Sequence, residues 1–376
     1  MKIIHIVRNI EYIGGTQKFL ISLLKYWRSK YSKDDLTMLC IEGIGPISEK
    51  IKQDYKIELV SLPITWWNPV GIVKLAHKLK ELKPDIVHTH LFQADFAGVI
   101  ASKIAKKKVV STKYCEFSRA LEKNNIFEKK FTKPVSDSIL EFILSKFTDR
   151  TIVVSEKAKK HFLTKGYAEK LLDVIPCCHI SLDNKLFKIP IDEVAINKRI
   201  IIGTVSRLVP EKGIDNLLCI FNEFQKNHSD SRLIIAGGGY LMKDLRKQTE
   251  KLGISRKVQF LGHIDNIEKP LVRINIFVFT SHTEGFPLAI QEAMSAGRAI
   301  ISTKVGGISE MIKDKQNGLL FSDGDNKQAV DLINTLVSEP KLAQRLSENA
   351  RKHIKKYRNL NEVASLIHNL YVKLER

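Results

Sequence analysis

The sequence predicts an α/β fold made of two Rossmann-like, doubly wound domains that face a cleft. Three observations lead to this prediction. The chain has 376 residues, which suits two domains better than one. Short β-branched runs alternate with longer amphipathic stretches, the pattern of parallel sheets covered by helices. This alternation pauses before residue 199 and then starts again.

The first domain is expected to span residues 1–190, and a polar, proline-containing linker is expected at about 186–198. Its predicted strands and helices alternate, with strands at 3–7, 36–41, 57–62, 85–90, 109–114, 150–155 and 173–176, and with helices that include 16–27 and 70–82. Because ligands of such sheets bind beyond the carboxyl ends of the strands, the loops that follow strands are where we look for chemistry.

The second domain is expected to span residues 199–357 and repeats the same pattern. Its predicted strands lie at 199–206, 232–238, 257–262, 276–281 and 299–304, and its predicted helices include 214–226, 240–253, 287–297 and 308–318. No residue-level repeat links the two halves, so the similarity is one of architecture.

The composition describes a globular and strongly basic protein. Hydrophobic residues make up 44% and charged residues 27% of the chain, which argues against disorder over most of its length. The formal net charge is +20, of which +13 falls in residues 1–190. Residues 101–133 hold ten Lys and Arg against three Glu, a patch that would attract phosphorylated metabolites, acidic glycans, anionic lipid or nucleic acid.

Cysteine usage and hydropathy favour a cytoplasmic protein. The five cysteines include no C-x-x-C pair, and Cys177 and Cys178 are adjacent, so a disulfide framework is not expected. The apolar run at the N-terminus is too short for a signal peptide and suits a first strand. No stretch approaches 18 apolar residues, so any membrane contact is expected to be peripheral.

Two glutamates, Glu284 and Glu292, stand eight positions apart around a predicted strand-to-helix turn. The strand at 276–281 leads into the turn, Pro287 suits the first helical position, and the helix is expected to end at Gly297. Glu284 would then precede the helix, and Glu292 would lie about a turn and a half into it.

This spacing lets one sugar nucleotide contact both carboxylates. Vicinal hydroxyls of the donor would reach Glu284 and Glu292, while its phosphates would rest against the N–H groups of Gly285 and Phe286. Leu288, in the first turn, is a further donor-binding candidate. Alternatively, Glu284 only complements the positive end of the helix dipole, and Glu292 is a solvated helix residue.

Two cations and two glycines follow the first strands of the domains. Arg207 and Lys212 lie in a proline-containing loop and could converge on a diphosphate if the loop folds back, although each could equally be solvated. Gly14 and Gly15 follow the first strand of the chain and would let the backbone approach a phosphate, or would simply form a tight turn.

The motif DIVHTH places His88 and His90 on one face of a predicted strand. An H-x-H pair suggests a metal, but no third ligand has a recognisable spacing, so no metal site is expected. A buried, hydrogen-bonded pair of histidines is the alternative.

Three stretches resemble the nucleotide-sugar domain of the family-4 retaining glycosyltransferases, which have the glycosyltransferase-B fold. They are residues 203–215 (GTVSRLVPEKGID), 284–303 (EGFPLAIQEAMSAGRAIIST) and 305–325 (VGGISEMIKDKQNGLLFSDGD). The resemblance extends over nearly the whole chain and is strongest from about 199 to 357. It implies that Glu292 holds the donor ribose, that Glu284 reaches the transferred sugar, and that Arg207 and Lys212 bind the diphosphate.

In the first domain the resemblance is less complete. It matches Gly14 and Gly15 to the family's glycine-pair loop, with Gln17 where many members have Glu. It places His90 near the cleft, as a catalytic candidate that contacts acceptor or donor. Tyr114 stands where many relatives have a histidine, which leaves the role of that loop open.

The resemblance also bears on metals and on the C-terminus. DGD at Asp323–Asp325 looks like the metal-binding D-x-D of the other major glycosyltransferase fold, but its position before a helical stretch favours a turn and an N-cap. Side chains and helix ends hold the diphosphate in glycosyltransferase-B enzymes, so neither a cofactor nor a required metal is expected. The last helix, at 358–376, is expected to cross back to the first domain.

The sequence therefore predicts a retaining glycosyltransferase that moves a sugar from a nucleotide-diphosphate donor to a glycan or lipid-linked acceptor, in bacterial surface polysaccharide or glycolipid synthesis. A sugar-nucleotide epimerase of the same fold is the alternative. The charge also raises a nucleic-acid-binding protein, but the basic patch lacks interleaved aromatics and a recognition motif, so no nucleic-acid partner is expected. The patch would instead suit an anionic inner leaflet.

Overall fold

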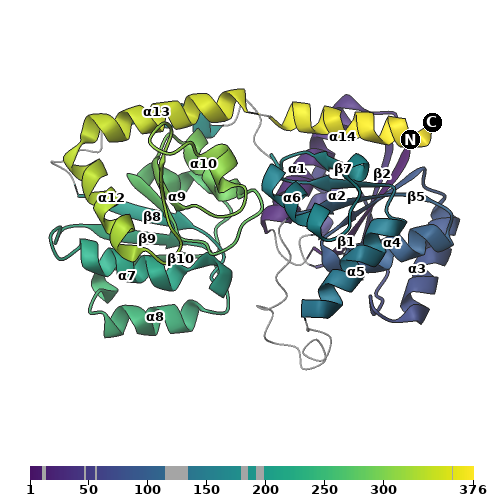
Figure 1. The fold of residues 1–376 in the computed structure, drawn as a ribbon, viewed down its shortest axis with the longest axis horizontal. Helices are drawn as coiled ribbons and strands as arrows, with labels where there is room; N and C mark the ends of the chain where they lie inside the picture. Colours follow the sequence, from purple (N-terminus) through teal and green to yellow (C-terminus); the bar gives the residue numbers. More distant parts are fainter. Residues whose placement is uncertain are drawn as a thin grey trace. The chain divides into compact units, whose positions relative to one another are not determined.

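Two parallel β-sheets, each with helices on both faces, organise the chain (Figure 1). The computed structural model describes residues 1–10, 14–45, 48–55, 57–114, 134–178, 185–191, 199–357 and 359–376. These residues form two compact units: unit 1 is Met1–His179 with Leu360–Arg376, and unit 2 is Ile180–Asn359.

Unit 1 is built on a seven-stranded parallel sheet with the strand order β3-β2-β1-β4-β5-β6-β7. Its central strands are almost fully buried because helices cover both faces, which explains their near-continuous apolar sequences. The elements are β1 (Lys2–Asn9), α1 (Gly15–Lys30), β2 (Asp35–Gly43), α2 (Ser48–Tyr55), β3 (Glu58–Ser61), α3 (Pro69–Leu82), β4 (Ile86–His90), α4 (Phe92–Ile104), β5 (Lys108–Lys113), α5 (Pro134–Phe147), β6 (Arg150–Val153), α6 (Glu156–Thr164), β7 (Leu172–Val174) and α14 (Leu360–Glu375).

The last helix, α14, belongs to unit 1 and packs against α1 (Figure 1). Tyr371 of α14 is fully buried, and its ring lies 5.4 Å from that of Trp27 in α1. Helices α3, α4 and α5 cover the opposite face of the sheet. Residues of β1 therefore alternate, so that Ile4 and Ile6 pack toward α3 and α4 while His5 lies on the side of α14.

Unit 2 is built on a six-stranded parallel sheet with the strand order β10-β9-β8-β11-β12-β13. The elements are β8 (Ile201–Val205), α7 (Ile214–Phe224), β9 (Arg232–Ala236), α8 (Met242–Lys251), β10 (Val258–Gly262), α9 (Glu268–Arg273), β11 (Ile276–Phe279), α10 (Leu288–Ser295), β12 (Ala299–Thr303), α11 (Ile308–Met311), β13 (Leu319–Phe321), α12 (Asn326–Ser338) and α13 (Pro340–Lys356). The prediction of two doubly wound α/β domains is confirmed.

Strand order reverses at the first strand of each sheet. In unit 1 the switch lies between β1 and β4, and in unit 2 it lies between β8 and β11. Loops that leave the carboxyl ends of these strand pairs diverge to opposite faces and leave room for a ligand. The candidate residues of the sequence analysis lie in these loops or at these strand ends. None of the described helices combines the length and the apolar character that crossing a bilayer requires.

Candidate functional site

Gly213 lets the loop after β8 lie against the end of β11, and any other residue at this position would be strained. Pro210–Lys212 form one 3-10 turn, and Gly213 follows with φ of 56°. A Cβ on Gly213 would lie 2.3 Å from the carbonyl oxygen of Thr280, whose own hydroxyl donates to the Gly213 carbonyl at 2.8 Å. The loop thus folds back over the neighbouring strand, which is the condition under which the sequence analysis expected Arg207 and Lys212 to converge.

Lys212 and Glu284 form an ion pair at this junction. Lys212 Nζ lies 2.5 Å from Glu284 Oε1, and the two side chains are only 16% and 8% exposed. Both residues were candidates, but the sequence analysis assigned them to different parts of a donor and did not foresee their contact. They are 72 positions apart in the chain, and only the pairing of β8 with β11 brings them together.

The backbone of Glu284 is fixed by the loop that follows β12. Gly306 has φ of 52°, and a Cβ there would lie 1.7 Å from the Glu284 carbonyl oxygen. Next to it, Gly307 N–H donates to the Gly285 carbonyl at 2.9 Å. Gly306 thus allows this close approach, and the backbone hydrogen bond from Gly307 holds the two loops together, which leaves Glu284 little freedom to move.

Helix α10 begins and ends close to its predicted limits. Pro287, expected at the first helical position, is instead the N-cap, so the helix begins one position later, at Leu288, and Gly297 ends the last turn with φ of 64°. Glu292 is 4% exposed, so the alternative that it is a solvated helix residue is wrong. No side-chain hydrogen bond caps the N-terminus of α10 among the described residues, and the first N–H groups of a helix have no partner within it.

The ring of Phe286, next to the predicted phosphate contact at Gly285, is also buried. It stacks on Tyr357 with a centroid distance of 5.7 Å and an interplanar angle of 23°. Phe286 therefore anchors the turn before α10, and only its backbone remains a candidate for ligand contact. Leu288, the first residue of the helix, is half-buried.

Arg207 stands apart from the Lys212 pair. It is exposed directly after β8, and the described residues provide no ion-pair partner for it. Beside it, Leu208 N–H donates to the Gly238 carbonyl at 2.8 Å, and a Cβ on Gly239 would lie 2.3 Å from the Leu208 carbonyl oxygen. The glycine run after β9 thus supports this loop. The sequence analysis did not single out that run, although three successive glycines at the end of a predicted strand could have indicated it.

The DGD sequence forms the predicted N-cap, and its first aspartate makes a further contact. Asp325 caps α12 by accepting the Gln328 N–H at 2.9 Å, which confirms the N-cap. Asp323 instead lies 2.8 Å from His282 Nδ1, in the loop that leads to Glu284. This contact was not predicted, because it joins residues on two different loops.

In unit 1 the structure adds a third histidine to the predicted pair. His5 of β1 lies opposite His88 of β4 in the sheet register, and ligand nitrogens of His5, His88 and His90 all lie within 4.8 Å of one another. The sequence analysis found no third ligand because the strand pairing, not a sequence spacing, supplies it. Within the described part of the chain, these three histidines are the group of residues whose ligand atoms lie close enough together to hold a metal ion.

Hydrogen bonds already occupy most of these ring nitrogens. His90 contacts Tyr114 Oη through Nδ1 at 2.7 Å and His5 Nδ1 through Nε2 at 2.9 Å. His88 contacts Thr112 Oγ1 at 2.6 Å and also the hydroxyl of Tyr371. His5 Nε2 is buried and finds no hydrogen-bond partner within the described part of the chain. The arrangement fits a hydrogen-bonded chain of rings better than a metal centre.

Burial keeps these histidines neutral. It lowers the pKa of His5 to about 3, and burial together with the neighbouring imidazoles lowers the pKa of His88 and His90 well below the usual value. Both ring nitrogens of His90 are engaged and its side chain is not exposed. This geometry matches the alternative of a buried, hydrogen-bonded histidine.

The glycine pair opens α1. Gly14 is the N-cap, with φ of −85° and extended backbone, and its carbonyl accepts the Lys18 N–H at 2.9 Å. A Cβ on Gly14 would meet only the flexible end of Gln17, at 2.9 Å. The conformation at Gly14 therefore does not by itself demand glycine, and Gly15 is the first residue of the helix.

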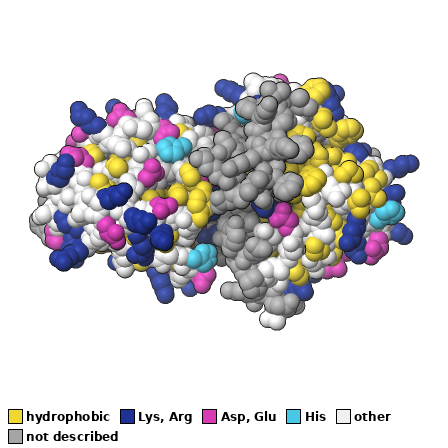
Figure 2. All heavy atoms as spheres, turned by 90° about the horizontal axis from the view of Figure 1, so that it is seen from below, with side chains coloured by type: hydrophobic (Ala, Val, Ile, Leu, Met, Phe, Trp, Pro, Cys, Tyr) yellow, Lys and Arg dark blue, Asp and Glu magenta, His cyan; other side chains and the backbone are white. Residues whose placement is uncertain are grey.

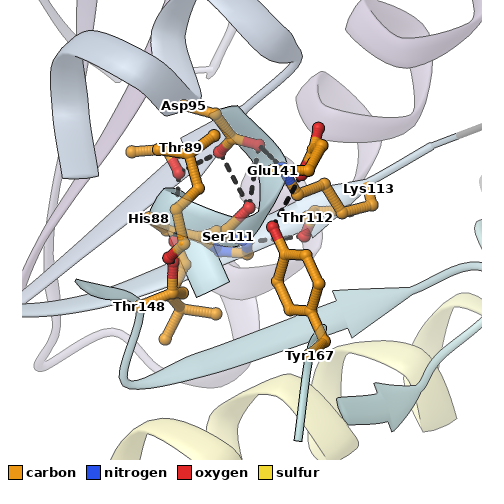
Figure 3. A network of polar contacts seen from close by, with 11 residues as sticks. His88, Thr89, Asp95, Ser111, Thr112, Lys113, Glu141, Thr148 and Tyr167 are labelled. Carbon is orange, nitrogen blue, oxygen red and sulfur yellow. Dashed lines mark hydrogen bonds and ion pairs between the residues drawn. The ribbon is translucent and has the colours of Figure 1, made fainter. Parts of the chain in front are cut away.

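A buried charge network stands behind the carboxyl end of β5 (Figure 3). Lys113 Nζ lies 2.9 Å from Asp95 and 3.0 Å from Glu141, and Tyr167 Oη donates to Glu141 at 2.7 Å. Ser111 donates to Asp95 as well. Burial alone would lower the pKa of Lys113, but the two carboxylates raise it well above its usual value.

This network corrects the expected basic patch at 101–133. Lys113 is 7% exposed and neutralised by its carboxylates, so it does not attract anions from solvent. Lys103 pairs with Asp149 at 2.9 Å. In the described part, Lys106–Lys108 remain as accessible charge, and residues 115–133 lie outside the described residues.

Two family models match almost the whole chain between them. The model described as Glycosyltransferase Family 4 matches residues 13–179, and the model described as Glycosyl transferases group 1 matches residues 188–353. The chain belongs to this family of glycosyltransferases, and it is an enzyme. The resemblance on which the sequence analysis relied is confirmed.

Similar proteins agree with this assignment. The chain is 26% identical to the Escherichia coli UDP-Gal:alpha-D-GlcNAc-diphosphoundecaprenol alpha-1,3-galactosyltransferase, over 100% of this chain and 97% of that protein. It is 29% identical to the Saccharomyces cerevisiae phosphatidylinositol N-acetylglucosaminyltransferase GPI3 subunit, over 61% of this chain and 50% of that protein.

Solved structures agree on the fold. Anabaena Alr3699/HepE in complex with UDP-glucose has a TM-score of 0.80 at 20% identity and covers 99% of this chain and 100% of its own. Sucrose-phosphate synthase from Thermosynechococcus elongatus has a TM-score of 0.80 at 18% identity, with 99% and 98% covered. The glycosyltransferase-B fold is confirmed, and the epimerase alternative is not favoured.

Proposed function

We propose that this glycosyltransferase moves a sugar from a nucleoside diphosphate sugar to a hydroxyl of a glycan or lipid-linked acceptor, with retention and without a metal. The observation that carries the proposal is the Lys212–Glu284 pair, held almost buried where β8 and β11 end. The names of similar proteins support it, since one uses UDP-Gal and a diphosphoundecaprenol acceptor and another binds UDP-glucose.

The ion pair leaves both partners able to bind a donor. A lysine ammonium has three N–H donors and a carboxylate has two acceptor oxygens, so one contact at 2.5 Å uses only part of each. Lys212 would donate its remaining N–H groups to a phosphate oxygen. Glu284, oriented by the same contact, would accept from a hydroxyl of the transferred sugar.

Arg207 would supply a second positive charge. Charge gathers on the diphosphate only as its bond to the anomeric carbon breaks, so fixed cations stabilise the transition state more than the ground state. Arg207 is exposed after β8 and can approach a ligand without first breaking an ion pair. The uncapped N-terminus of α10 would add N–H donors to the same phosphates.

Glu292 would bind the donor ribose. It lies in the second turn of α10, in the helix that Glu284 precedes, and its carboxylate is nearly buried. A fixed carboxylate is a good acceptor for two adjacent hydroxyl groups. This contact is made in both the ground and transition states, so it serves affinity more than rate.

Retention would follow from attack on the same face as the leaving group. The bond from the anomeric carbon to the phosphate oxygen breaks with its electron pair going to the diphosphate. The bond to the acceptor oxygen forms, and the acceptor proton passes to an oxygen of the departing phosphate. This route needs no protein nucleophile, in keeping with a Glu284 carboxylate that is engaged by Lys212.

The place of reaction belongs to the same proposal. A diphosphate-linked lipid acceptor, such as that named for the Escherichia coli relative, is presented at a membrane. We place this enzyme in the cytoplasm, peripheral on the inner face of the cytoplasmic membrane, in surface polysaccharide or glycolipid synthesis. Nucleic acid is not a partner in this proposal.

Donor hydrolysis tests the proposal most directly. The protein is incubated with UDP-, GDP- and ADP-sugars without acceptor, and release of nucleoside diphosphate is followed with and without EDTA. We expect slow hydrolysis of one class of donor, at the same rate with EDTA, and an NMR coupling constant that reports the donor's anomeric configuration in the product. Inversion, or loss of rate in EDTA with rescue by Mn²⁺, contradicts the mechanism.

A further inference from the structure

Unit 1 exposes an unusual number of large apolar side chains on its α3, α4 and α5 side. Figure 2 shows hydrophobic side chains gathered there, at the right of the view. Among the residues that the structure describes, seven of the ten exposed large hydrophobic side chains belong to this side: Trp67, Val70, Val73, Ile104, Phe142, Ile143 and Phe147. We call this surface, together with the turn after α4, the α3–α5 face.

The apolar residues of the α3–α5 face follow helical spacing on the outer side of each helix. Val70 is 75% exposed and Val73 lies one turn further along α3. In α4, Ile104 is 45% exposed near the end of the helix, whereas Phe96 and Ile100 are half-buried and pack against the core. The three helices are adjacent, since α3 contacts α4 and α4 contacts α5. Core-facing residues would be buried, so the exposed Val70, Val73 and Ile104 belong to an outward apolar surface.

Two tryptophans extend the face beyond α3. Trp67 is 54% exposed just before the helix, whereas Trp66 packs its ring edge-on against Phe92 and Phe96 of α4. An exposed Trp beside a half-buried one is a costly placement for a surface that stays in water. Indole rings are typical of the boundary between a bilayer's hydrocarbon and its headgroups.

Charge on the α3–α5 face is almost entirely positive. Lys74, Lys146 and Lys106–Lys108 are exposed or half-exposed around the apolar residues. Among the side chains described for these helices and the turn, Glu81 is the one exposed carboxylate, and it pairs with Lys78 at 2.6 Å. An apolar centre with a basic surround is complementary to an anionic bilayer and to few other surfaces.

We propose that the α3–α5 face docks on an anionic lipid bilayer, with Trp67 and Val70 inserted among the headgroups and Lys106–Lys108 bound to lipid phosphates. The proposal deepens the proposed function, on which it rests for the lipid-linked acceptor, because it names the surface that meets the membrane. Docking itself requires neither donor nor acceptor, so it can be tested alone.

Vesicle binding measures the docking directly. The full chain is sedimented with sucrose-loaded phosphatidylcholine vesicles that contain or lack phosphatidylglycerol. We expect binding to the anionic vesicles only. Replacing Lys106, Lys107 and Lys108 by Gln should weaken it roughly fivefold per lysine. Val70→Glu combined with Ile104→Glu should weaken it at least tenfold.

A matched control separates docking from a general loss of apolar surface. Val272 of α9, in unit 2, is 54% exposed, and Val272→Glu makes the same chemical change away from the α3–α5 face. It should bind vesicles as the wild type does. Equal weakening by Val272→Glu, or no weakening by the Val70 and Ile104 changes, overturns the proposal.

Trp67 reports insertion without a label. Of the three tryptophans, Trp27 is fully buried and Trp66 is packed against α4, so Trp67 should account for most lipid-dependent fluorescence change. We expect a blue shift on anionic vesicles and quenching by lipids brominated in the acyl chain, both lost in Trp67→Phe. Unchanged emission on bound vesicles would mean that another surface binds.

Two further outcomes are decisive. If sedimentation equilibrium shows dimers that the Val70 and Ile104 changes dissolve, the face pairs with a second copy and the lipid assignment is overturned. If the protein docks as expected but hydrolyses no donor, the proposed function fails while the docking stands. Conversely, donor hydrolysis in the Val70 and Ile104 variant should match the wild type, because neither residue belongs to the donor site.

Discussion

Lys212 could act on the reaction in two ways, and a double-mutant cycle can separate them. It could hold Glu284 in place through the 2.5 Å ion pair, or it could also bind the departing diphosphate. The cycle compares the wild type with Lys212→Ala, Glu284→Gln and the double variant. Glu284→Gln keeps the shape of the side chain while removing its charge.

The structure sets the size of the expected effects. Removing one cation that stabilises developing charge lowers kcat by about 10² to 10³. Lys212→Ala also leaves the Glu284 carboxylate, which is 8% exposed, without its partner. Breaking a buried pair costs about 3 to 5 kcal/mol of folding free energy, and we expect the lower end because Lys212 is 16% exposed.

The cycle is measured as kcat/KM for donor hydrolysis and as Tm by circular dichroism. If Lys212 also binds the diphosphate, the double variant falls below the more damaging single variant, and full multiplication of the losses, about 10⁴ to 10⁶ if Glu284→Gln itself costs about 10² to 10³, is the upper limit because the two residues are in contact. If Lys212 acts only through Glu284, the double variant is no worse than the more damaging single variant. In both cases the double variant should recover part of the Tm lost in Lys212→Ala, since no carboxylate is left unpaired.

Arg207→Ala is the matched control for this cycle. Arg207 has no ion-pair partner among the described residues, so its loss should leave Tm unchanged while kcat falls by about 10² to 10³. Full activity in Arg207→Ala or in Lys212→Ala refutes the assignment of these cations to the diphosphate.

Three further predictions concern buried groups. Glu292→Ala should raise the donor KM by roughly 10- to 100-fold with little change in kcat, and an unchanged KM contradicts the ribose assignment. Because burial lowers the pKa of His5 to about 3, the unfolded chain takes up this proton first as the pH falls below about 6.5; His5 should therefore cost about 2 kcal/mol of folding free energy between pH 7 and pH 5. Urea unfolding at both pH values should show this loss, and His5→Phe should reduce it. Lys113→Met should destabilise the fold by about 3 to 5 kcal/mol in urea unfolding, because Asp95 and Glu141 lose their counter-ion, whereas Lys106→Met should change it by less than about 0.5 kcal/mol.

Local features of the fold could be predicted from the sequence because each depends on neighbouring residues. The β-branched runs became strands, Gly297 ended α10, and Asp325 capped α12. Each of these follows from side-chain shape, a positive φ or a hydrogen bond that spans three residues.

Contacts between strands could not be predicted in the same way. His5 meets His90 across 85 positions, and Lys212 meets Glu284 across 72. These contacts depend on strand order and register, for which hydrophobic periodicity carries no information. Lys113 shows the same limit, because a lysine in a basic stretch gives no indication that two carboxylates from different helices will bury it.

The switch points of the two sheets carry different kinds of side chain, charged cations in unit 2 and neutral histidines in unit 1. Between β8 and β11 the loops carry Lys212 and the exposed Arg207, charges suited to a diphosphate. At the matching point between β1 and β4 stand neutral, buried histidines whose ring nitrogens are largely used within unit 1. Acid should therefore act on the two units separately: protonation of the histidines weakens the fold of unit 1, whereas the cations of unit 2 keep their charge throughout. Donor affinity should hold as the pH falls from 7 to 6, and its loss at lower pH should coincide with unfolding and not precede it.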